Sequence, residues 1–251
     1  MHKRAIAAFV ALALVVTACG DDDDEATEGD TSADTDDTTS DSGSEEGEQA
    51  AGGEFCAEYQ ALLAGDPTPE QIREVAAVAP EDGKAPLEEL AAGFEADSEG
   101  FFETEEFQAA FSEIGEVANA ECADEVLEVT AVDYGFEGMP SELSAGTYGV
   151  TLANEGQEFH EIAVFRKADG VTASFDDIFA VDDPEQIDES QLEEIGGTFA
   201  PPGGEGGGLF DLEAGEYIAV CFVPVGATPD NEEADGAPHY TEGMQAQFTV
   251  S

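Results

Sequence analysis

This chain of 251 residues has very few basic side chains. It contains six lysines and arginines against 60 aspartates and glutamates, which gives a formal net charge of −54. Proteins that bind nucleic acid need basic residues to neutralise phosphates, so we expect no nucleic-acid partner. Repulsion among so many carboxylates destabilises a compact state unless salt screens it, which suggests adaptation to a salty environment.

Catalytic motifs are also lacking. No serine is placed by a motif near a histidine and an acid, and the carboxylates are too numerous for any pair to stand out as a glycosidase pair. The glycine-rich residues 196–208 have no following lysine and no strand–turn–helix context, so they do not predict a phosphate-binding loop. We expect a flexible loop there. The chain is therefore not expected to be an enzyme.

Long apolar runs are absent except at the N-terminus. Lys3 and Arg4 precede the apolar residues 5–16, which are too few to span a bilayer and are typical of a signal peptide. The next residues, Val-Thr-Ala-Cys-Gly, resemble a bacterial lipobox, which implies a signal peptide at residues 1–18 and lipid on Cys19. The resemblance predicts a lipoprotein of the cell envelope that is anchored to a membrane and faces outside the cytoplasm. An ordinary secretory signal with a chance cysteine is the alternative.

Residues 19–53 are predicted to form an acidic, disordered tether. From residue 20 onward they contain fourteen acids, no base and no large apolar side chain, so they cannot bury enough apolar surface to offset the entropy of ordering. Subtracting these acids from 60 leaves 46 in the rest of the chain, which has only four bases. The acidity therefore extends over the folded part as well.

Residues 54–123 are predicted to form a small helical domain. Thr68 is a plausible N-cap for a helix that begins with proline, a third helix is expected to start at Pro86, and the longest is expected to start near Thr104. Apolar side chains follow the helical period in each of them. No recognisable catalytic motif lies in this region, so we expect a structural helical bundle, with a partner-docking or ion-binding role as the alternative.

Two cysteines bracket this helical domain. Cys56 lies in its first helix and Cys122 at the end of its last. Because exported proteins meet an oxidising environment, we expect a disulfide between them, with pairing of Cys56 to Cys221 as the alternative. Under the first pairing Cys221 is left alone, and an odd cysteine in an exported protein needs a partner, a metal or a reactive role.

From residue 125 onward the apolar pattern changes to a period of two, which is typical of β-strands. Short strands with glycine- and proline-rich turns favour a two-sheet Greek-key sandwich. The fold is therefore expected to be mainly β, with a β-sandwich domain at residues 125–251 after the small α-helical domain. Strands are expected at residues 126–136, 146–154, 159–166, 215–222 and 244–250, and two short acidic helices at residues 175–181 and 184–195.

Histidines are scarce in the mature chain and fall within this second domain. His2 leaves with the signal peptide, so His160 and His239 are the remaining histidines. With Cys221 and Met244, they could bring a thiolate, imidazoles and a thioether to one end of a β-sandwich. Such a set of donors suits copper.

Three stretches in residues 126–251 resemble the cupredoxin, or blue-copper, family. They are LFDLEAGEYIAVC before the cysteine, PHYTEGM at the second histidine and the methionine, and NEGQEFHEIAVF at the first histidine. The resemblance implies one type 1 copper ion, with His160, Cys221 and His239 in a plane and Met244 as a weak axial ligand. It implies a one-electron carrier with an unidentified redox protein as its partner.

The sequence departs from the family in the segment between Cys221 and His239. Residues 222–238 form a longer connection than the family usually has, and they include the acidic stretch GATPDNEEADG. The site depends on this segment returning His239 to the cysteine. Two alternatives therefore remain: a copper-free binding or scaffold lipoprotein with the same sandwich, and a protein that hands on metal ions.

Overall fold

The computed structural model describes residues 52–63, 67–98, 100–181, 183–231 and 234–251. The predicted signal peptide, the predicted lipidation site Cys19 and nearly all of the predicted tether lie outside these ranges. Within the described ranges, no helix combines the length and the apolar character needed to cross a membrane.

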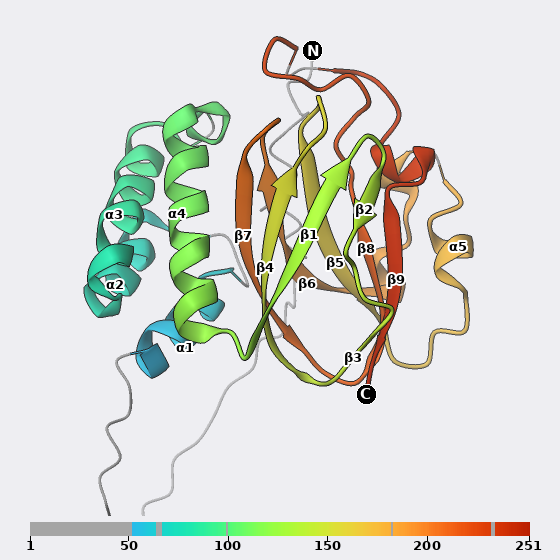
Figure 1. Cartoon of the computed structure of the whole chain (residues 1–251), viewed down its shortest axis with the longest axis horizontal. Coiled ribbons are helices and arrows are strands. Elements are labelled where there is room, and N and C mark those ends of the chain that lie inside the picture. Colours follow the sequence, from blue (N-terminus) through green and yellow to red (C-terminus); the bar gives the residue numbers. More distant parts are fainter. Residues whose placement is uncertain (1–51, 64–66, 99, 182, 232–233) are drawn as a thin grey trace, which may run out of the picture.

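A helical unit precedes the strands (Figure 1). It consists of α1 (Gly52–Leu63), α2 (Pro69–Val78), α3 (Glu81–Ala96), a 3-10 turn η2 (Phe101–Glu103) and α4 (Glu105–Cys122). Thr68 and Thr104 cap α2 and α4 as predicted, because each hydroxyl accepts the backbone N–H three residues later. Helix α3 starts before Pro86, which lies inside it, since the acids Glu81 and Asp82 in its first turn favour the helix dipole.

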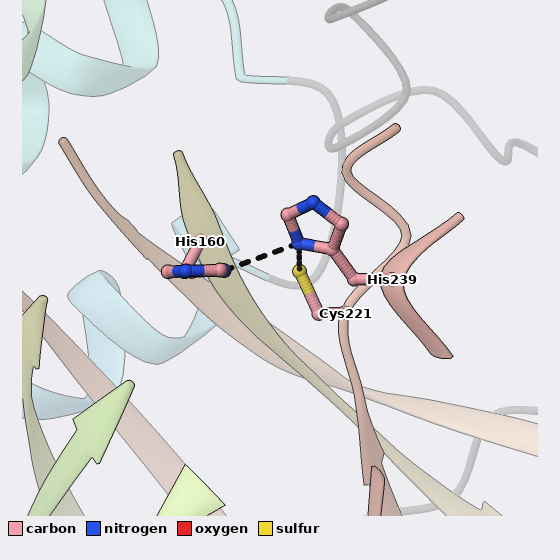
Figure 2. Close-up of side chains that lie close together, drawn as sticks. All are labelled: His160, Cys221 and His239. Atoms are coloured by element: carbon pink, nitrogen blue, oxygen red, sulfur yellow. Dashed lines mark hydrogen bonds between the residues drawn. The ribbon is translucent and has the colours of Figure 1, made fainter. Parts of the chain in front are cut away.

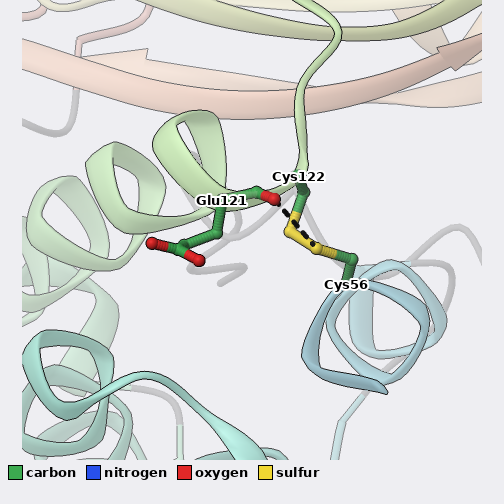
Figure 3. The surroundings of a disulfide bond; sticks show 3 residues. All are labelled: Cys56, Glu121 and Cys122. Atoms are coloured by element: carbon green, nitrogen blue, oxygen red, sulfur yellow. Dashed lines mark hydrogen bonds between the residues drawn. A yellow bond between two sulfur atoms is a disulfide. The ribbon is translucent and has the colours of Figure 1, made fainter. Parts of the chain in front are cut away.

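The predicted disulfide between Cys56 and Cys122 is present (Figure 3). Their Cα atoms are 5.4 Å apart, and the bond joins α1 to the last residue of α4. Strand β1 (Glu125–Val132) follows directly. The disulfide therefore holds the beginning of the described chain beside the point where the β-sandwich starts.

Two sheets form the β-sandwich in the described part of the chain. The remaining strands are β2 (Gly135–Glu137), β3 (Glu142–Leu143), β4 (Gly146–Asn154), β5 (His160–Lys167), β6 (Leu192–Ala200), β7 (Glu205–Leu212), β8 (Gly215–Val220) and β9 (Gln245–Val250). The sheet order is β2-β1-β4-β7 in sheet A and β3-β9-β8-β5-β6 in sheet B. The pairs β1–β4 and β3–β9 are parallel, and the other paired strands are antiparallel. Apolar side chains from both sheets fill the space between them, including Val129, Val150, Leu152, Ile162, Val164, Tyr217, Phe248 and Val250. The predicted fold class, mainly β after a small helical domain, is confirmed.

Helix α4 lies against the outer face of sheet A (Figure 1). The prediction of a flexible loop at residues 196–208, which lie partly under this helix, is wrong. Most of these residues belong to β6 and β7. A Cβ atom on Gly115 of α4 would lie 2.6 Å from the backbone of Gly207, so helix and strand touch through glycines. The amide of Asn119 donates to the Val150 carbonyl at 3.0 Å. Glycine hides the alternating pattern of a strand because it has no side chain.

The predicted acidic helix at residues 184–195 is also wrong. Two single 3-10 turns, η3 (Pro184–Gln186) and η4 (Glu189–Gln191), lie there instead. Asp183 and Asp188 each cap one turn by accepting the backbone N–H two residues later. From Leu192 the chain pairs with Lys167 of β5, so strand pairing prevails over helix formation.

The predicted helix at residues 175–181 is present as the shorter α5 (Phe175–Ile178), which covers the outer face of sheet B. Next to it, the ring of Phe179 lies 5.7 Å from that of Tyr240, which in turn lies 5.5 Å from that of Phe222. This aromatic cluster anchors the residues that follow Cys221 and His239 in the sequence.

Candidate metal centre

Four predicted ligands come from four segments that meet at one end of sheet B. His160 is the first residue of β5, and Cys221 directly follows β8. His239 opens the 3-10 turn η5 (His239–Glu242), and Met244 directly precedes β9. Since β5 and β9 both pair with β8, the hydrogen bonds of the sheet bring these positions to the same end of the sheet.

Three of the four side chains form a buried cluster (Figure 2). The Nδ1 atoms of His160 and His239 are 3.1 Å apart, and Nδ1 of His239 is 3.3 Å from Sγ of Cys221. All three donor atoms lie within 4.8 Å of one another, and none of the three residues is exposed to solvent. Metal–nitrogen bonds are about 2 Å long and metal–sulfur bonds about 2.3 Å, so donor atoms 3.1 and 3.3 Å apart can share one ion. The cluster therefore fits a single metal ion.

The long connection at residues 222–238 returns to the site. The backbone N–H of Val225 donates to Ala237 at 2.9 Å, and that of His239 donates to Val223 at 2.9 Å. The next amide, of Tyr240, donates to the carbonyl of Cys221 at 2.9 Å. These bonds pair the two ends of the connection in antiparallel fashion. The extra length therefore does not separate His239 from Cys221.

Met244 is held beside the cluster by its backbone. Its N–H donates to the His239 carbonyl at 3.1 Å, and its own carbonyl accepts the N–H of Cys221 at 3.2 Å. Its side chain is fully buried in the apolar core that also contains Cys221. Met244 thus joins the other three residues at the same end of the sandwich.

Solved structures resemble about half of the chain. No protein-family model and no curated protein matches the sequence. Among solved structures, reduced auracyanin from Roseiflexus castenholzii is similar, with 21% identity, a TM-score of 0.33, and coverage of 51% of this chain and 98% of that one. Auracyanin A, a "blue" copper protein from Chloroflexus aurantiacus, has 16% identity and a TM-score of 0.31, covering 50% and 98%. Rusticyanin from Thiobacillus ferrooxidans has 22% identity and a TM-score of 0.30, covering 50% and 77%.

The sheets and the cluster themselves decide the fold. Two packed sheets carry a His-Cys-His cluster at one end, with the first histidine opening one strand and the cysteine ending another. The β-sandwich is cupredoxin-like. The helical unit packs on the outer face of its sheet A through α4.

In the cupredoxin-like domain, both histidines turn their second ring nitrogen away from the cluster and onto a carboxylate. Nε2 of His160 lies 2.7 Å from Oδ1 of Asp133, and Nε2 of His239 lies 3.0 Å from Oε2 of Glu158. Since a carboxylate only accepts, Nε2 carries the hydrogen in each neutral ring. Neither Nδ1 then carries a hydrogen, so the 3.1 Å contact between the two Nδ1 atoms is not a hydrogen bond, and both lone pairs face the cluster, where a metal would bind.

Burial sets the protonation of the cluster. It lowers the pKa of both His160 and His239, although the neighbouring carboxylates act in the opposite direction. It also raises the pKa of the Cys221 thiol well above its usual range, and the nearby Glu161 adds to this effect. At neutral pH the metal-free cluster is therefore two neutral imidazoles and a thiol. A bound metal ion would displace the thiol proton, because the thiolate is the metal ligand.

The two carboxylates remain ionised for a different reason. Burial alone would raise the pKa of Asp133, but its hydrogen bonds to His160 and to the N–H of Gln157 outweigh burial and lower it. The pKa of Glu158 is likewise lowered by hydrogen bonds, despite burial. One of these comes from Tyr134, whose own pKa is raised to about 12 by burial and by Glu158, so its hydroxyl stays a donor.

Glu161 is a further buried acid beside the cluster. It is 2% exposed, and its Oε1 accepts the backbone N–H of Phe222 at 2.6 Å. Burial raises its pKa to about 8, although this hydrogen bond opposes the shift. The sequence analysis did not single out Glu161 as a buried acid of the site. Its pattern could have indicated this, since Glu161 is the charged residue on an otherwise apolar face of the predicted strand at residues 159–166.

Proposed function

We propose that this chain is a one-electron carrier that holds one type 1 copper ion in its cupredoxin-like domain. The observation that carries the proposal is the buried cluster of His160, Cys221 and His239, with donor atoms within 4.8 Å and Met244 beside it. Two imidazoles, a thiolate and a weak axial thioether are the donor set of electron-transfer copper sites. A copper ion bound there would supply one-electron redox chemistry.

The residues of the chain then provide a rigid, dry site. The sheet ladder holds Cys221, the paired ends of residues 222–238 hold His239, and β5 holds His160. Since these side chains have no solvent exposure, water is excluded and a substrate could not reach the donor atoms. This arrangement supports passage of electrons to a redox protein rather than catalysis on a bound substrate.

The visible spectrum of the purified protein loaded with cupric ion tests the proposal. We expect an intense blue or green colour, because charge transfer from thiolate to copper produces it. Cys221→Ser should abolish the colour even if copper still binds, and His239→Ala should weaken or bleach it. Met244→Leu is the matched control, since a weak axial bond tunes the site without holding it: the colour should persist with a shifted reduction potential. A wild-type protein that stays colourless in excess cupric ion would instead support a copper-free scaffold.

We also infer that the protein is attached to a membrane through lipid on Cys19 and faces outside the cytoplasm. The support is the basic residues, the short apolar run and the lipobox-like Val-Thr-Ala-Cys at the N-terminus. In a bacterial host, Cys19→Ala should move the protein from the membrane fraction to the soluble fraction, whereas Cys221→Ser should leave it with the membranes. A Cys19→Ala variant that stays bound would contradict the anchor.

A further inference from the structure

The contacts of the two histidines outside the cluster form a matched pair. Each imidazole turns Nδ1 inward and presents Nε2 to one carboxylate, Asp133 for His160 and Glu158 for His239. Asp133 directly follows β1 and Glu158 lies two residues before β5, so the two acids come from different turns at the same end of the sandwich. In a chain with 60 acids a carboxylate near a histidine is unremarkable by itself, so the surroundings of these two decide whether they are built in.

Both carboxylates are fixed by other groups. Asp133 accepts the backbone N–H of Gln157, with its two oxygens 3.3 and 3.1 Å from that nitrogen. Glu158 accepts the backbone N–H of Gly226 at 2.5 Å and the hydroxyl of Tyr134 at 3.0 Å. Backbone donors cannot swing away as side chains can. The acids are therefore held in place before any metal binds.

Two neighbours restrict the imidazoles further. The ring of Tyr134 lies against that of His239, with their centroids 4.7 Å apart. Gly156 lies over the bond between His160 and Asp133: a Cβ atom there would be 2.3 Å from Oδ1 of the acid and 2.6 Å from Nε2 of the histidine. Only glycine leaves room for that hydrogen bond. The pairing of each histidine with its acid is thus enforced on several sides.

We propose that Asp133 and Glu158 are positioning residues of the copper site, which fix the ligand geometry and lower its reduction potential. Each acid keeps the hydrogen on Nε2 and the lone pair of Nδ1 directed at the cluster. Hydrogen bonding to a carboxylate also makes the ligating nitrogen more basic, and the two negative charges favour the higher charge of the cupric ion. This inference rests on the proposed copper function, but the orientation of the rings is a property of the metal-free protein as well.

The first experiment uses the metal-free protein. Nitrogen-15 NMR of the imidazoles distinguishes hydrogen on Nε2 from hydrogen on Nδ1. We expect wild type to show both rings with hydrogen on Nε2 alone, and Asp133→Ala and Glu158→Ala each to give a mixture at the adjacent ring. Rings that keep the Nε2 form in both variants would overturn the positioning role, whether or not the protein binds copper.

The second experiment measures the reduction potential of the copper-loaded protein. Asp133→Asn and Glu158→Gln preserve size and an accepting oxygen but remove charge, and each should favour the cuprous form about tenfold, which is 59 mV for one electron. Gly156→Ala keeps every charge but displaces Asp133 from its histidine, so it should raise the potential too. Glu155→Gln is the control, since this exposed acid is next to Gly156 and should leave the potential unchanged.

The outcomes separate this inference from the proposed function. Blue protein with equal potentials in wild type and in the Asp133→Asn, Glu158→Gln and Gly156→Ala variants would overturn the inference and leave electron transfer standing. An equal shift in Glu155→Gln would also overturn it, because general surface charge would then explain the effect. If wild type takes up no copper, the proposed function fails and the NMR result alone decides whether the acids position the rings.

Discussion

Replacing Glu161 by glutamine should change how the stability of the metal-free protein depends on pH. The carboxyl group is fully buried on β5 beside His160, and burial raises its pKa to about 8. In the unfolded chain a glutamate titrates near its reference value of about 4.3. The folded protein therefore keeps a proton on Glu161 that the unfolded chain releases. Glutamine has nearly the same shape, can accept the N–H of Phe222 and cannot ionise.

The sign follows from proton linkage. Because the folded pKa is the higher one, the folded state binds more protons, and the contribution of Glu161 to stability is complete below about pH 4 and is lost as pH rises towards 8. One pKa unit corresponds to about 1.4 kcal/mol, so between pH 6 and pH 8 the loss is about 2 kcal/mol. Over this range wild type should lose about 2 kcal/mol more of its free energy of unfolding than Glu161→Gln does.

Urea unfolding of both proteins without metal, at pH 6 and at pH 8, measures this difference. Molar salt in all samples screens the other carboxylates, and the titration of the histidines is common to both proteins and cancels. Equal losses of stability between pH 6 and pH 8 in the two proteins would refute the reasoning. Glu161 would then be ionised in the folded state.

Three further results are expected. Replacing Cys56 and Cys122 by alanine should lower the free energy of unfolding by about 4 kcal/mol, since the bond closes a loop with a sequence separation of 66. Urea unfolding measures this, and an unchanged midpoint would contradict it. Gly115→Ala should lower the free energy of unfolding by about 1–3 kcal/mol, because its Cβ would collide with the backbone of Gly207. Equal thermal midpoints for variant and wild type would contradict the close contact. The thermal midpoint of wild type should rise from low to molar sodium chloride, and a flat response would count against salt adaptation.

Local patterns predicted much of the architecture. The alternating residues 146–154 coincide with β4, and the capping threonines mark the starts of α2 and α4. The residues His160, Cys221 and His239 were proposed from their types, their order and flanking motifs that resemble the cupredoxin family. The structure brings them together. Such features depend on neighbours in sequence, so they can be read without knowing the fold.

Other features depend on contacts between distant segments. Asp133 and Glu158 could not be singled out among 60 acids, because their role depends on which turns meet at the end of the sandwich. Residues 196–208 were predicted as a loop because their glycines hide the alternation of a strand, and the reason for Gly207 is a contact with Gly115 in α4. The position of His239 next to Cys221 likewise depends on backbone pairing between the two ends of residues 222–238, which no local sequence pattern predicts.

The position of the disulfide decides how the proposed lipid anchor would orient the domain. It holds α1 beside the start of β1, whereas Asp133, at the other end of that strand, borders the metal cluster. Strand β1 has eight residues and is about 27 Å long, so α1 lies near the end of the sandwich opposite Asp133 (Figure 1). If Cys19 carries lipid, residues 20–51 can reach at most about 110 Å from the bilayer. Anchored from that end, the domain would direct the cluster of His160, Cys221 and His239 away from the membrane.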